Sequence, residues 1–126
     1  MKAIFVIGTG RSGTHFTVRS LRGFQNTFDP LEGDEKLDVL MTVAKAAIHH
    51  KKLPEAAYCY FRDQINGAGG IFLDQHHPNL FFIRELVKIS DEIVFLCPVR
   101  PVYQVVASML RHEQGNRFWP KLLRYL

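Results

Sequence analysis

The sequence lacks the long apolar runs that would place the chain in a membrane or mark it for export. No segment approaches the roughly 20 consecutive apolar residues that a membrane-spanning helix needs. The apolar stretch 3–7 is too short for a signal peptide and runs directly into a glycine-rich segment. We therefore expect no membrane span, and we expect the cytoplasm as the location.

Cysteines and clustered basic residues are also scarce. Cys59 and Cys97 lie far apart and match no metal-binding or redox spacing, so we expect reduced, packed thiols in a reducing compartment. The formal charge is +4 at pH 7, but Lys and Arg form no run and no basic helix face. Because nucleic-acid binding depends on many phosphate contacts, we expect no nucleic-acid partner. The modest positive charge suits an anionic small molecule.

Apolar residues are plentiful enough for one core. The chain has 126 residues, of which 47% are hydrophobic and ten are Phe, and this predicts a single domain over 1–126. Short apolar runs at 3–7, 70–74 and 92–97 predict buried parallel strands, and 26–29 supplies a further short strand. Helical patterns follow these runs, which indicates an α/β domain. The expected architecture is a three-layer, P-loop-like parallel sheet flanked by helices, small or incomplete.

Apolar residues spaced about 3.6 apart predict the helices. Helices are expected from Asp34, from Pro54 to Arg62, from Pro78, and after Pro101. The predicted core stripes are Leu37, Leu40, Met41, Ala44 and Ile48 in the first helix, Leu80, Ile83, Leu86 and Val87 in the third, and Val102, Val105, Val106, Met109 and Leu110 in the last. The histidines and lysines at 49–52 suit the negative end of the first helix dipole and require no metal.

The segment "FVIGTGRSGTHFT" (5–17) predicts an anion site. It places a strand, a glycine-rich turn and a helix in order, and the first N–H groups of a helix are unpaired and lie at the positive end of its dipole. Glycines let the backbone fold close to an anion, and Arg11 adds a positive fork. The residues expected to bind the anion are Gly10, Arg11, Ser12, Gly13, Thr14 and His15.

This loop departs from the usual ATP-binding pattern. That pattern requires Gly-Lys-Ser/Thr, whereas Thr14 follows Gly13 here and the positive charge comes earlier, at Arg11. Apart from Asp74, no neighbouring strand end offers a carboxylate for magnesium. An ordinary ATPase or GTPase is therefore disfavoured.

The "GTGRSGT" loop resembles the 5′-phosphosulfate loop of sulfotransferases that use 3′-phosphoadenosine 5′-phosphosulfate (PAPS), in the Arg-Ser-Gly-Thr form of the carbohydrate, tyrosylprotein and bacterial branches. The segment "IVFLCPVRPVYQVVASMLRH" (93–112) resembles the family's 3′-phosphate segment, with Arg100 at a strand end and Ser108 on the next helix. The expected position of Arg100 agrees with a role in phosphate binding, because α/β sheets bind ligands at the carboxyl ends of their strands. The resemblance implies PAPS as sulfuryl donor, PAP as product, and no metal.

The resemblance also suggests catalytic residues. Arg11 would stabilise the leaving phosphate, and a base is needed for the acceptor hydroxyl. Glu32 falls at the position of the catalytic glutamate in the tyrosylprotein-type branch. In "LDQHHPNL" (73–80), His76 takes the place of the family's lysine that assists the leaving phosphate. Alternatively, His76 or His77 is the base, as a histidine is in the cytosolic branch.

The implied function is sulfuryl transfer from PAPS to a hydroxyl acceptor on a sugar, lipid or small molecule. Sulfotransferases are usually much longer, and the segment that closes over the adenine would come after this chain's last residues. Three explanations stay open: a truncated gene product, a fragment, or a minimal domain that completes itself as a homodimer. Two other functions stay open as well, a P-loop small-molecule kinase with a degenerate loop and a non-catalytic PAP- or nucleotide-binding module.

Overall fold

The fold is built on a parallel sheet. The computed structural model describes residues 1–22, 24, 26–28, 34–67 and 69–116. Its strands are β1 (Ala3–Val6), β2 (Thr27–Phe28), β3 (Ile71–Asp74) and β4 (Ile93–Leu96), and they form an all-parallel sheet in the order β2-β3-β1-β4. In the middle of the sheet, Ile4 pairs with Leu73 on one side and with Val94 on the other. The α/β class and the expected strands, including the short one near residue 27, are confirmed.

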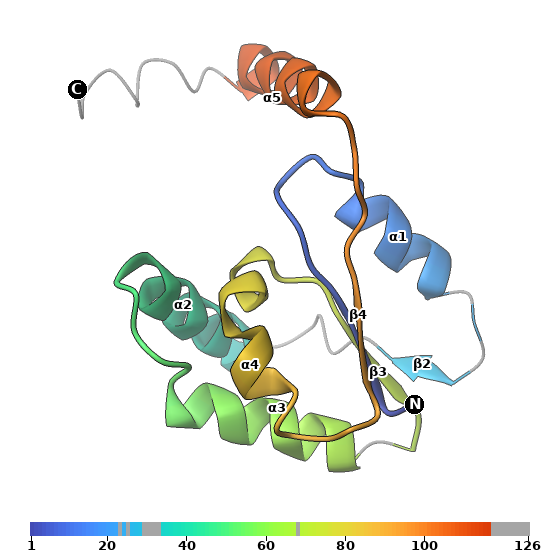
Figure 1. The fold of residues 1–126 in the computed structure, drawn as a ribbon, viewed down its shortest axis with the longest axis vertical. Coiled ribbons are helices and arrows are strands. Elements are labelled where there is room, and N and C mark those ends of the chain that lie inside the picture. Colours follow the sequence, from blue (N-terminus) through green and yellow to red (C-terminus); the bar gives the residue numbers. More distant parts are fainter. Residues whose placement is uncertain (23, 25, 29–33, 68, 117–126) are drawn as a thin grey trace.

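Helices cover both faces of this sheet (Figure 1). They are α1 (Thr14–Leu21), α2 (Asp34–Ile48), α3 (Glu55–Gly67), the 3₁₀ helix η1 (His77–Phe82), α4 (Ile83–Leu86) and α5 (Val102–Asn116). Helix α1 packs on one face, while α2, α3, η1 and α4 pack on the other. The expected helices are therefore present, although α3 continues past Arg62 and the segment from Pro78 begins as a 3₁₀ helix.

Side chains of β1 alternate between the two cores, as a strand buried on both faces requires. Ile4 and Val6 pack with Val18 of α1. Phe5 points to the opposite face, where its ring lies 5.6, 5.7 and 5.5 Å from the rings of Phe61, Phe72 and Phe95. This aromatic cluster joins β1 to both neighbouring strands and to α3.

The predicted core stripe of α2 is wrong in its phase. Met41 and Ile48 are 51% and 72% exposed, while Val43 and Ala46 are buried against the sheet. Helix α2 is apolar around more than half of its circumference, so the periodicity fits more than one face. Contact with α3 and the sheet selects the face that carries Val43 and Ala46.

The predicted core stripe of the segment after Pro78 is wrong in part. Leu86 is buried as expected, but Leu80 and Val87 are exposed and Phe82 is buried. The 3₁₀ start, with three residues per turn, shifts the inward positions.

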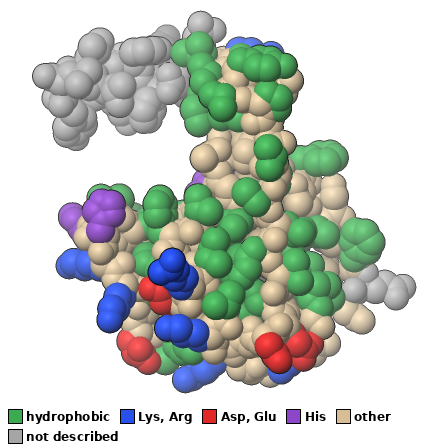
Figure 2. Space-filling view, in the orientation of Figure 1, with side chains coloured by type: hydrophobic (Ala, Val, Ile, Leu, Met, Phe, Trp, Pro, Cys, Tyr) green, Lys and Arg blue, Asp and Glu red, His purple; other side chains and the backbone are tan. Residues whose placement is uncertain are grey.

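The apolar stripe of α5 is largely outside the core. Val102 is 77% exposed, and the stripe members Val106, Met109 and Leu110 are exposed too. Helix α5 lies beyond the carboxyl edge of the sheet rather than over either face (Figure 1), and apolar side chains are visible on it in Figure 2. The local pattern predicted the helix correctly, but the pattern contains no information about which layer the helix meets.

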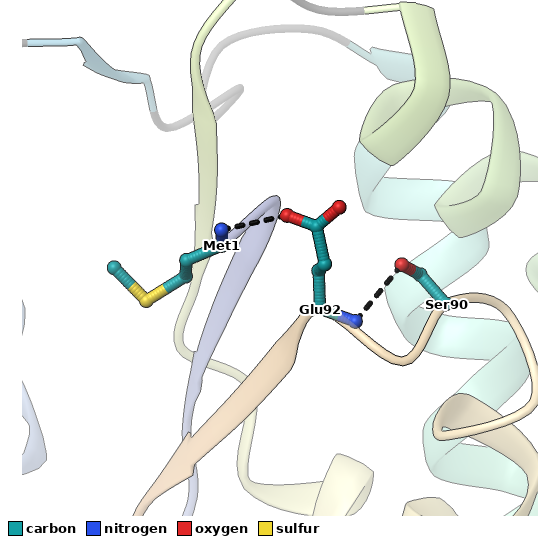
Figure 3. Close-up of polar contacts among 3 residues, drawn as sticks. All are labelled: Met1, Ser90 and Glu92. Atoms are coloured by element: carbon teal, nitrogen blue, oxygen red, sulfur yellow. Dashed lines mark hydrogen bonds and ion pairs between the residues drawn. The ribbon is translucent and has the colours of Figure 1, made fainter.

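The amino edge of the sheet carries a small polar cluster (Figure 3). The Met1 amino group forms an ion pair with Glu92 at 2.7 Å, and the Glu92 backbone N–H donates to Ser90 Oγ at 3.1 Å. The hydrogen bond from the amino group, and then its charge, lower the pKa of Glu92. This pair is exposed, and it lies at the edge opposite to the carboxyl ends of β1 and β4.

The two thiols are unpaired. Cys59 is half-buried, but Cys97 is exposed, so the prediction of packed thiols is wrong for Cys97. Within the described ranges, no helix combines the length and the apolar character that crossing a bilayer requires.

Candidate anion site at the carboxyl edge of the sheet

Three loops meet at the carboxyl edge of the sheet. They follow β1, β3 and β4, and because these strands are parallel neighbours, their ends lie side by side. This is the edge at which open α/β sheets bind ligands. The loops contain the glycine-rich motif, the histidines of 76–77, and Arg100.

The loop after β1 has an unusual backbone. Gly8, Arg11 and Gly13 have φ angles of 144°, 67° and 106°. The Ser12 hydroxyl donates to the Thr9 carbonyl oxygen at 2.7 Å, which closes the turn. Gly13 is the N-cap residue of α1, and no side chain caps this helix start. The first N–H groups of α1 are therefore presented at the carboxyl edge, where an anion can accept from them.

Gly13→Ala is expected to destabilise the protein by about 1–2 kcal/mol, because a Cβ is disfavoured at positive φ. Gly10→Ala is the matched control: a Cβ at either position would meet no atom within 4 Å, but only Gly13 has a positive φ. Gly10→Ala should therefore leave the free energy of unfolding unchanged within about 0.5 kcal/mol or raise it slightly. Urea denaturation of both variants measures the difference. Equal stabilities would show that the loop conformation imposes no strain at Gly13.

The two sequence motifs are in direct contact. Arg11 Nε donates to Ser108 Oγ at 3.1 Å, and Arg100 Nη1 donates to the Arg11 carbonyl oxygen at 3.3 Å. Arg100 Nε also donates to Gln104 Oε1 at 3.1 Å, so Gln104 orients the arginine from the first turn of α5. Gln104 was not among the predicted site residues, although its position on the polar face of the helix that follows Arg100 could have indicated it.

A cavity of about 180 Å³ lies where these residues meet. It is lined by Arg11, Gly13, Thr14, His15, Arg100 and Ser108. These lining residues supply two guanidinium groups and no carboxylate, so the cavity is electropositive and favours an anion. A larger cavity of about 640 Å³ lies at the amino end of β3, beside β2, and includes no residue of either motif.

The other predicted site residues have different positions. Gly10 and Ser12 belong to the loop but do not line the cavity, and the Ser12 hydroxyl is used within the turn. His76 precedes η1, and its carbonyl oxygen accepts from the Asn79 N–H at 3.0 Å. Glu32 lies outside the described residues, and its catalytic role stays a prediction.

His77, named above as an alternative base, lies against the loop. Its Nδ1 is 3.0 Å from the Gly8 carbonyl oxygen, and its ring centroid is 6.5 Å from that of His15. The turn that contains His77 is held to the end of β3. Asn79 Nδ2 donates to Asp74 Oδ2 at 2.7 Å, and both residues are buried. Asp74 thus holds the start of η1 at the end of β3.

Comparisons with known proteins identify no relative of this chain. No protein-family model, no curated protein and no solved structure matches this chain. Since the comparisons give no match, the likeness to PAPS-dependent sulfotransferases rests on the two motifs of this sequence.

Within the part of the chain that the structure describes, no group of three His, Cys, Asp or Glu side chains could hold a metal ion.

Proposed function

We propose that this chain binds PAPS and PAP at the carboxyl edge of the sheet and acts as a PAPS-dependent sulfotransferase. The observation that supports this most is the meeting of the two motifs: Arg11 contacts Ser108 and Arg100 across 97 and 89 residues of sequence. The two motifs are separate in the sequence, at 5–17 and 93–112. A chance likeness in either one would not require the two to line a common cavity.

The size and charge of the cavity fit an anionic group rather than a whole nucleotide. Sites for drug-sized ligands have volumes of roughly 300–1,000 Å³, whereas this cavity measures about 180 Å³. A phosphate or sulfate group suits the two guanidinium groups and the start of α1. The adenosine part would then extend outside the cavity.

The residues of the chain suit sulfuryl transfer in the following way. PAPS supplies the sulfuryl group, and the protein has to position it and stabilise charge on the leaving phosphate. The α1 N-terminus and Arg11 stabilise that charge. Two of the five N–H donors of Arg100 bind protein oxygens, which fixes the plane of the guanidinium and keeps other donors for a phosphate. A base for the acceptor would come from Glu32, His76 or His77.

Titration calorimetry with PAP tests this proposal. Arg100→Ala is expected to weaken PAP binding about tenfold to a hundredfold, because a hydrogen-bonded charge contributes about 1.5–3 kcal/mol. Arg84→Ala is the matched control: it makes the same change in net charge at an exposed position on α4, and it should leave PAP binding unchanged. No detectable binding at millimolar PAP would overturn the proposal.

Two other outcomes would replace it with a different function. Magnesium-dependent ATP binding that outcompetes PAP would favour the small-molecule kinase. PAP binding without sulfuryl transfer to any acceptor in a screen would favour the non-catalytic binding module.

A further inference from the structure

Large apolar side chains are exposed where the end of α2 meets the start of η1. Ile48 is 72% exposed and Phe81 is 66% exposed. Both line one open pocket of about 430 Å³, together with Ala44, Ala47 and Leu80. Exposed apolar side chains that gather in one place mark an interaction surface, whereas scattered single ones need no explanation.

Basic side chains lie beside these apolar ones. Five exposed lysines and histidines occur at this end of α2: Lys45, His49, His50, Lys51 and Lys52. Neither 39–54 nor 75–82 contains an Asp or Glu. In Figure 2, histidine side chains gather at this end of α2, with apolar side chains beside them and Lys or Arg side chains close by. We call the five basic residues, with Ile48 and Phe81, the α2-end patch.

The turn after α2 fixes the basic residues next to Ile48. His50 has a φ of 51°, and its N–H donates to the Ala47 carbonyl oxygen at 3.2 Å. The Lys51 N–H donates to the Ala46 carbonyl oxygen at 2.9 Å. Bonds of this kind close the last turn of a helix. The backbone therefore holds cations and an exposed apolar side chain together on one surface.

The helix dipole explains only part of this arrangement. Cations are favourable at the carboxyl end of a helix, which accounts for the basic residues at 49–52. The dipole does not account for Ile48 and Phe81, which are exposed at the same place. The interface of a membrane accounts for both, because apolar groups leave water there while cations meet negative headgroups.

From this combination we propose that the α2-end patch docks the protein on the surface of a membrane that contains anionic lipids. Ile48 and Phe81 enter the boundary between headgroups and acyl chains, where their removal from water is favourable. The lysines contact the headgroups, and their hydrocarbon stems lie along the apolar surface. No helix crosses the bilayer in this arrangement. The docking does not depend on the function proposed above.

Docking at this patch would also orient the anion site. Gly8 and Thr9 of the glycine loop line the same pocket as Ile48 and Phe81. The carboxyl edge of the sheet, where the anion cavity lies, would therefore be held close to the membrane. A substrate or product that is dissolved in the bilayer would be within reach of that edge.

Sedimentation of the full chain with lipid vesicles tests this proposal. Saturable binding is expected to phosphatidylcholine vesicles that contain about one-third phosphatidylserine, and binding to pure phosphatidylcholine should be at least about tenfold weaker. Raising NaCl from about 0.1 M to about 1 M should remove most of the binding, because the Debye length falls from about 10 Å to about 3 Å.

The cationic part of the patch is tested by a double substitution. Lys51→Gln with Lys52→Gln is expected to weaken binding to the anionic vesicles about tenfold to thirtyfold. Lys2→Gln with Arg19→Gln is the matched control, because it removes the same charge from exposed positions before β1 and on α1. The control should weaken vesicle binding less than about threefold.

The apolar part is tested by Phe81→Gln, which should weaken binding to the anionic vesicles about fivefold to tenfold. Phe16→Gln is the matched control: Phe16 is 76% exposed, and it lies on α1, which packs on the other face of the sheet. It should leave vesicle binding unchanged. Thermal unfolding should show that both variants are folded, since both side chains are largely exposed.

Four results would overturn the proposal. They are equal binding to neutral and anionic vesicles, equal weakening by a patch variant and its control, binding of soluble poly-glutamate as tight as that of the vesicles, and a dimer that Phe81→Gln dissociates. The third would assign the patch to an acidic polypeptide, and the fourth to a second copy of this chain.

One further variant separates this surface from the anion cavity. Arg100→Ala should bind the anionic vesicles as tightly as the unmodified chain does, because Arg100 lines the anion cavity and not the pocket of the patch. Loss of vesicle binding in Arg100→Ala would overturn the docking, since the headgroups would then be held by the anion cavity.

Discussion

Arg11→Gly is expected to bind PAP much more weakly than the unmodified chain and yet to be more stable than Arg11→Ala. Arg11 has a φ of 67°, in the left-handed region that favours glycine. A non-glycine residue there costs about 1–2 kcal/mol. The guanidinium lines the anion cavity and bonds to Ser108, so its loss should weaken PAP binding at least about tenfold. The loop would thus hold its cationic residue at a cost in stability.

The comparison with alanine isolates the backbone effect. Arg11→Ala and Arg11→Gly both remove the charge and the bond to Ser108, so both should bind PAP equally weakly. Only the glycine relieves the strain, and urea denaturation should give it a free energy of unfolding higher by about 1 kcal/mol. Equal stability of the two variants would contradict a strained Arg11. PAP binding that persists in both would contradict the role of Arg11 in the anion site.

Phe5→Ala is expected to produce the largest loss of stability, about 3–5 kcal/mol. Phe5 is fully buried at the centre of the aromatic cluster, where it contacts the rings of Phe61, Phe72 and Phe95. Alanine would lose this burial and leave a cavity between the sheet and α3. Because domains are stable by only about 5–15 kcal/mol in total, much of the native population could be lost at raised temperature.

Phe16→Ala is the control for this loss. Phe16 lies on α1 and is 76% exposed, so the same substitution there should change the free energy of unfolding by less than about 0.5 kcal/mol. Urea denaturation with circular dichroism measures both variants. A loss below about 1 kcal/mol for Phe5→Ala would show that Phe5 does not anchor the core.

The sequence predicted the structure around Phe5 and around the two motifs well. The strand of Phe5 was predictable because a short, continuous apolar run suits a parallel strand buried on both faces. The glycine-rich turn and α1 were predictable because the glycines, Arg11 and the helical pattern are contiguous in the sequence. The end of β4 was predictable for a similar reason, since it is a short apolar run, although the strand ends at Leu96 and Arg100 lies four residues beyond it.

The side of each helix that packs against the core was less predictable. The stripe of α2 was assigned to the face of Met41 and Ile48, whereas the sheet and α3 contact the face of Val43 and Ala46. Periodicity gives the angle between apolar residues around a helix, but it does not say which side the sheet lies on. For the same reason, nothing local in the sequence indicated that the second apolar side of α2 would line a pocket next to Gly8.

The sequence by itself determined the α/β class, the strands and the two charged motifs, because each of these depends on residues that are neighbours in the chain. Only the tertiary structure decided that Arg11 contacts Arg100 and Ser108, and that His77 bonds to the Gly8 carbonyl oxygen. These contacts depend on strand order: β1 lies between β3 and β4, which brings the three loops to one edge. That order is set by packing across the whole sheet, and no short segment of the chain specifies it.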